Sequence, residues 1–179
     1  MSASSTLRPR EHGAYAMLAF PILSGLLMGG ASLPGLAFAG LAVSAFLAHE
    51  SVLVILGGRG ERLRTARHGA AWRRLARLGA LALLAGTLFA ASAPSSALRP
   101  ALVAGGLGTL VAGLLVAGRT RTLAGELLVA VAFASVHGPV AAAGRASAPE
   151  IYLPAVAWAT SFVLATLSVH SIKFRFKRR

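Results

Sequence analysis

Long apolar stretches separated by short basic segments constrain this 179-residue chain more than any other feature. A helix needs about 17–25 mostly apolar residues to cross the hydrocarbon layer of a membrane. Six stretches meet this length, at residues 13–30, 33–56, 75–92, 97–118, 123–143 and 151–172. The sequence therefore predicts an all-α fold, a polytopic bundle of about six transmembrane helices that forms a single domain over residues 1–179.

Composition supports lipid as the solvent of this chain. Hydrophobic residues make up 56% of the sequence and charged residues only 13%, whereas a soluble domain carries about 25% charged residues. A chain this short still needs a wetted surface in water, so a larger core cannot explain the missing charge. The chain contains no cysteine, which excludes disulfides, thiolate catalysis and cysteine-ligated metal centres.

The basic residues fix an orientation through the positive-inside rule. With the N-terminus in the cytoplasm, the cytoplasmic segments hold sixteen basic residues, namely Arg8, Arg10, Arg59, Arg62, Arg64, Arg67, Arg73, Arg74, Arg77, Arg119, Arg121, Lys173, Arg175, Lys177, Arg178 and Arg179. The opposite segments hold only two, Arg99 and Arg145. The pattern predicts that both termini are cytoplasmic and that the protein resides in the cell membrane.

The net charge of +13 would suggest a nucleic-acid partner in a soluble protein. Here the charges lie between apolar runs, so we expect no nucleic acid and expect contact with anionic lipid headgroups at the cytoplasmic face. Residues 57–74 hold six arginines, and we expect this segment to be a polybasic loop. An alternative is that some of these arginines bind a substrate phosphate.

A small set of polar residues lies near the cytoplasmic ends of four predicted spans. An ionised side chain at the bilayer centre costs about 2.5–3.5 kcal/mol on insertion scales, so such residues usually face the protein interior. Glu50 lies about 9 Å from the end of its span, at 1.5 Å per residue. The sequence predicts an inward-facing polar pocket formed by Arg10, His12, His49, Glu50, Arg121, Glu126 and His170.

Structural roles are the alternatives for several of these residues. Glu126 can pair with Arg121 or Arg119 at the membrane interface, and His12 and His170 can be solvated there. His137 precedes Gly138-Pro139, which should open its helix, and a hydrogen bond to a freed carbonyl would then explain it. We predict no metal site, because no two of the candidate histidines and carboxylates have the i, i+3 or i, i+4 spacing of paired ligands.

Small residues form faces on two spans. Gly25 and Gly29 make a GxxxG pair, and further glycines crowd the fourth span at Gly105, Gly106, Gly108 and Gly113. Such residues let helix backbones approach closely in lipid. We expect close packing within one bundle, and an oligomer formed through these faces is the alternative.

Two segments carry a resemblance to a known family. The opening Pro9-Arg10-Glu11-His12-Gly13-Ala14-Tyr15-Ala16-Met17, followed by Pro21, resembles the start of the YwiC-like family of bacterial membrane proteins. The segment Arg121-Thr122-Leu123-Ala124-Gly125-Glu126-Leu127 is also similar to that family. The resemblance implies a polytopic membrane protein and marks His12, Gly13 and Glu126 as motif residues, without naming a reaction or a cofactor.

The chain also resembles UbiA-type prenyltransferases more distantly. Those enzymes carry carboxylates near the cytoplasmic end of their second span, where this chain has His49-Glu50. Their paired Asp-rich motifs are absent, because this chain contains no aspartate.

The sequence is consistent with three functions. The first is a cytoplasm-side pocket that binds a small molecule or lipid, as in a carrier. The second is a transferase acting on a lipid or isoprenoid diphosphate substrate, and the third is a non-catalytic membrane assembly subunit.

Overall fold

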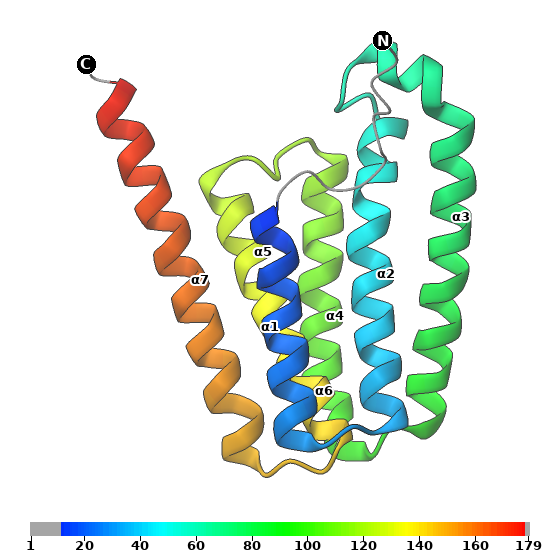
Figure 1. The fold of residues 1–179 in the computed structure, drawn as a ribbon, viewed down its shortest axis with the longest axis vertical. Coiled ribbons are helices and arrows are strands. Elements are labelled where there is room, and N and C mark those ends of the chain that lie inside the picture. Colours follow the sequence, from blue (N-terminus) through cyan, green and yellow to red (C-terminus); the bar gives the residue numbers. More distant parts are fainter. Residues whose placement is uncertain (1–11, 178–179) are drawn as a thin grey trace.

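Helices occupy almost all of the chain that the structure describes. The computed structural model covers the backbone of residues 12–177 and the side chains of residues 13–171. The helices are α1 (His12–Gly29), α2 (Leu33–Ile55), α3 (Glu61–Ser92), α4 (Ser95–Val116), α5 (Leu123–Ser135), α6 (His137–Ala143) and α7 (Ala148–Lys177). No strand occurs within residues 12–177, so the predicted all-α bundle is confirmed (Figure 1).

The predicted spans correspond closely to these helices. Five helical segments are long and apolar enough to cross a membrane, with α5 and α6 counted as one, and α1 is a shorter apolar helix. Two helix starts have local causes: the side chains of Ser32 and Thr122 accept hydrogen bonds from the amides of Gly35 and Gly125. Both hydroxyls thus satisfy amides that a helix start leaves without a partner.

The predicted polybasic loop at residues 57–74 is wrong for most of its length. From Glu61 onward the segment is helical and continuous with the third span, so α3 has 32 residues and is about 48 Å long at 1.5 Å per residue. Ala, Leu and Arg are strong helix formers, and no proline interrupts the run. Only residues 57–60 of the segment lie outside a helix, and there Gly57 and Gly60 have positive φ, 77° and 95°.

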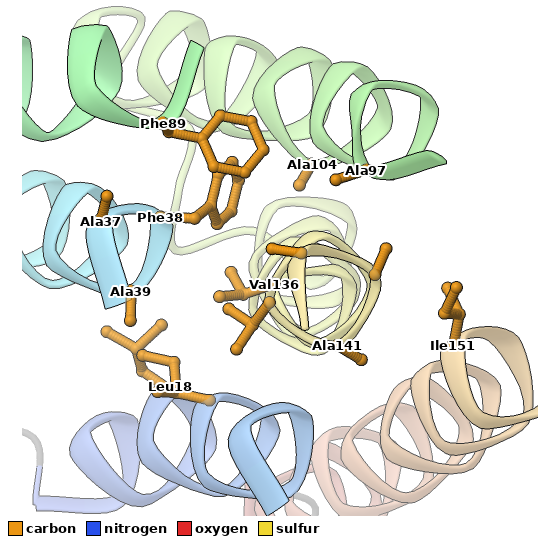
Figure 2. Packing of buried hydrophobic residues seen from close by; sticks show 14 residues of the cluster. Leu18, Ala37, Phe38, Ala39, Phe89, Ala97, Ala104, Val136, Ala141 and Ile151 are labelled. Atoms are coloured by element: carbon orange, nitrogen blue, oxygen red, sulfur yellow. The ribbon is translucent and has the colours of Figure 1, made fainter. Parts of the chain in front are cut away.

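The centre of the bundle is α6, a seven-residue helix that is buried at every position. It contacts α1, α2, α4, α5 and α7, whereas α3 packs mainly on α2 at the edge (Figure 1). Figure 2 shows Val136 and Ala141 in the middle of the core, with Leu18, Phe38 and Ile151 around them on three other helices. The break between α5 and α6 follows the prediction that Gly138-Pro139 opens this span.

The GxxxG pair of α1 packs inside this chain. A side chain at Gly25 would meet Val140 of α6 at 3.0 Å, and one at Gly29 would collide with the backbone of Ala141. A side chain at Gly144 would likewise collide with the carbonyl of Gly29. The glycines of α4 differ, because Gly105 and its neighbours on that helix have open space beside them. An oligomer through the α4 face stays a prediction.

Candidate functional site

The polar candidates differ in burial and in hydrogen-bond partners. Arg10 and the side chain of His12 lie outside the described residues. His49 lies half-buried on α2, beside Glu50, and Arg121 is exposed just before α5. The two carboxylates of the set, Glu50 and Glu126, have different partners.

Glu50 forms a buried ion pair with Arg59. The guanidinium Nε and Nη2 atoms lie 2.9 and 2.7 Å from the two carboxylate oxygens, so the contact is bidentate. Only 6% of the Glu50 side chain is exposed, against 21% for Arg59. The glycines at 57 and 60 allow the chain to reverse after α2, which returns Arg59 to the helix it has just left. Sequence reasoning assigned Arg59 to the polybasic segment and missed this pairing.

Glu126 pairs with His170 rather than with Arg119 or Arg121. The imidazole Nε2 lies 2.8 Å from a carboxylate oxygen of Glu126, and the two side chains are 35% and 31% exposed. Glu126 stands in the first turn of α5 and His170 near the end of α7, so the contact joins two helices that are distant in sequence. Glu126 and His170 are thus two members of the predicted pocket that the structure brings into direct contact.

The two carboxylates of the predicted pocket therefore have different hydrogen-bond partners. Glu50 is engaged by a residue outside the predicted set, while Glu126 and His170 meet each other. One turn before Glu50, the ring of Phe46 contacts Tyr15 and Phe133 in an aromatic cluster. Among the described residues no three His, Asp or Glu side chains gather in a metal-like group. A cavity shared by both carboxylates stays a prediction.

A third polar group lies at the break between α5 and α6. His137 is fully buried, with Nδ1 2.9 Å from the Ser24 hydroxyl and Nε2 2.9 Å from the carbonyl oxygen of Glu150. That carbonyl needs a donor because the residue four positions later is Pro154, which has no N–H. The indole of Trp158 also donates to the Ser24 hydroxyl, at 3.0 Å.

This group explains His137 as the sequence suggested, through a carbonyl freed by a proline. The carbonyl belongs to α7, however, and is freed by Pro154 rather than by the Gly-Pro beside the histidine. Because a carbonyl only accepts, Nε2 is the donor in the contact with Glu150. The Ser24 hydroxyl donates to the carbonyl oxygen of Pro21, at 3.1 Å, and also lies within hydrogen-bond distance of Nδ1. Sequence reasoning missed Ser24 and Trp158, whose types and spacing give no signal of this contact.

The chain is similar to one known protein family over most of its length. A model of the YwiC-like protein family matches residues 8–142, about three quarters of the sequence. The chain belongs to the YwiC-like family. The resemblance predicted from the opening motif and from residues 121–127 is thus confirmed.

The YwiC-like match includes Glu50, Arg59, Glu126 and His137, while His170 lies beyond its end. No curated protein and no solved structure matches the chain, so the distant resemblance to UbiA-type prenyltransferases has no support. The family and the helices together identify a multi-pass membrane protein.

Proposed function

We propose that this YwiC-like protein binds a small molecule or a lipid headgroup at the paired side chains of Glu126 and His170, and that it acts as a carrier. The observation that supports this proposal is the 2.8 Å contact between these side chains, each about one-third exposed. An intramembrane or near-membrane ionisable group is costly to bury, so it usually marks a functional site.

The chemistry of the pair suits polar ligands. The carboxylate accepts hydrogen bonds, and the imidazole can accept or donate, so the pair can exchange its mutual contact for contacts to a ligand. Exposure of both groups leaves a route for that ligand. Glu50 lacks this freedom, because two bonds from Arg59 already occupy its carboxylate oxygens. We therefore assign Glu50 to the structure of the α2 end rather than to ligand binding.

Native mass spectrometry in mild detergent tests the site. We expect a discrete mass retained by the wild-type protein to be lost from Glu126→Gln and from His170→Gln. The matched control is Glu61→Gln, which removes an exposed acid, 71% accessible, on α3. A mass retained equally by all four proteins would refute the site. No retained mass in any of them, with intact folding, would favour the assembly-subunit function.

The identity of the retained mass separates the remaining functions. A phospholipid or a small metabolite supports a binding or carrier role. An isoprenoid diphosphate would instead support the transferase alternative, and Glu126 with His170 would then lie beside its substrate.

The proposal includes an orientation in the bacterial cell membrane, with both termini in the cytoplasm and the arginines of α3 near anionic headgroups. The chain has no cysteine, so single cysteines can report this directly. Ala66→Cys on α3 and Ala31→Cys in the turn after α1 are both at exposed positions. We expect a membrane-impermeant maleimide to label only the cysteine at position 31 in intact cells. Labelling of the cysteine at position 66 alone would show that the protein has the opposite orientation in the membrane.

A further inference from the structure

A second polar site lies at the end of the bundle that is poor in arginine. A cavity of about 540 Å³ opens between the start of α4 and the start of α7, at the opposite end from the basic start of α3 (Figure 1). Its polar lining consists of Ser95, Ser96, Arg99 and Tyr152, and the buried side chain of Ile151 forms part of its apolar wall.

Arg99 gives this cavity its charge. No carboxylate pairs with Arg99 among residues 13–171. The acid next to the lining residues, Glu150, already accepts hydrogen bonds from the amide and the hydroxyl of Ser147, both at 2.7 Å. The cavity therefore presents a guanidinium and hydroxyl groups, and no acidic side chain lines it. This set of donors favours an anionic ligand.

The shape and chemistry narrow the class of anion. Ligand cavities in proteins measure about 300–1,000 Å³, so this cavity is large enough for a whole headgroup. A guanidinium matches the oxygens of a phosphate in a bidentate contact, and the hydroxyl of Ser96 or Tyr152 can donate to a third oxygen. The apolar wall at Ile151 suits the carbon chain attached to a phosphate ester.

We propose that this cavity binds a phosphate group, carried by a phospholipid headgroup or free in solution, with Arg99 as its main contact. The site is independent of Glu126 and His170, because it lies at the other end of α7. Loss of binding at either end would therefore leave the other intact, and failure of one proposal does not decide the other.

Arginine modification by phenylglyoxal, mapped by peptide mass spectrometry, tests the site in the full chain. The delipidated protein in non-ionic detergent is treated with phenylglyoxal in three parallel samples. These samples contain chloride, inorganic phosphate or a short-chain phosphatidylglycerol. Arg145 is the matched control, because it is exposed at the same end of the bundle but does not line the cavity. A ligand at ten times its Kd should slow modification of Arg99 about tenfold by mass action, with Arg145 unchanged.

Each arm has a defined meaning. Protection of Arg99 by phosphatidylglycerol alone assigns the cavity to a lipid headgroup, and protection by phosphate as well assigns it to the phosphate group itself. Equal protection of Arg99 and Arg145, or protection of neither, overturns the proposal. Tyr152→Phe should weaken the protection of Arg99, and this variant keeps the ring and its packing.

Discussion

Two glutamates at the same end of the bundle have opposite environments. Glu50 is sealed, with 6% of its side chain exposed and both oxygens held by Arg59. Glu126 is open, with 35% of its side chain exposed and a single contact to His170. Both lie about two turns or less from a helix end, so depth does not separate them. The glycine-bounded turn after α2 supplies a cation to one, and a distant helix supplies an imidazole to the other.

The exposed fraction of the side chain, more than its depth in a span, therefore separates structural carboxylates from candidate binding groups. A buried ion pair contributes little net stability compared with apolar side chains, but removal of one partner leaves a buried charge. An ion pair that is partly exposed is screened by solvent and is worth about 0–1 kcal/mol. Substitutions at these and other buried polar side chains test this contrast.

The sealed pair should show the largest effect. Arg59→Ala removes the cation and leaves the Glu50 carboxylate buried without that partner, which we expect to cost about 3–5 kcal/mol of unfolding free energy. Denaturation in detergent, followed by circular dichroism, measures the loss. The double variant Glu50→Leu with Arg59→Leu removes both charges and should recover most of the stability. A single variant as stable as wild type would contradict the assignment.

Substitution of the buried His137 should cause the second-largest loss of stability. His137→Ala removes a buried side chain that contacts α1 and α7 and leaves the Glu150 carbonyl without its donor, for a cost of about 2–4 kcal/mol. Trp158→Phe removes only the indole donor to Ser24 while retaining an aromatic ring beside Phe20 and Phe162, so about 1 kcal/mol is expected. Thermal unfolding of the two variants in the same detergent compares them. The reverse order would show that the histidine contacts contribute less than its position suggests.

The open pair should show little effect on folding. Glu126→Gln keeps the size of the side chain and removes its charge, so we expect a change within about 1 kcal/mol. The same denaturation measurement as for Arg59→Ala allows the two losses of unfolding free energy to be compared directly. If Glu126→Gln destabilised the protein as strongly as Arg59→Ala, the contrast between a structural and a binding carboxylate would fail.

Ser51→Ala, at the position next to Glu50, should make the protein slightly more stable. The hydroxyl of Ser51 is buried, and no hydrogen-bond partner is present for it among the described residues. Removing an unsatisfied buried polar group avoids its desolvation cost, so Ser51→Ala should raise the unfolding free energy by about 1 kcal/mol. A parallel Ser44→Ala variant, also buried on α2, provides a comparison. Destabilisation by Ser51→Ala would indicate that the hydroxyl has a partner in the membrane-embedded protein.

Hydropathy alone was sufficient to predict the spans, because each helix in lipid must satisfy its own backbone and cover its length with apolar side chains. The helical start of α3 was not predicted, since its arginines were interpreted as a loop although their helix propensity is high. The pairing of Glu126 with His170 and of Ser24 with His137 depends on which helices become neighbours. Sequence spacing carries no information on contacts 44 or 113 positions apart.

The central position of α6 has a consequence for the order in which the protein assembles during synthesis. This short helix is broken from α5, and its surroundings come from both ends of the chain, with Gly29 before it and Ile151 after it. Helices that enter the membrane one at a time can form the α2 and α3 hairpin early. The core around His137 closes only after α7 has left the ribosome, so a truncated chain that ends before Trp158 should remain loose and be a substrate for membrane proteases.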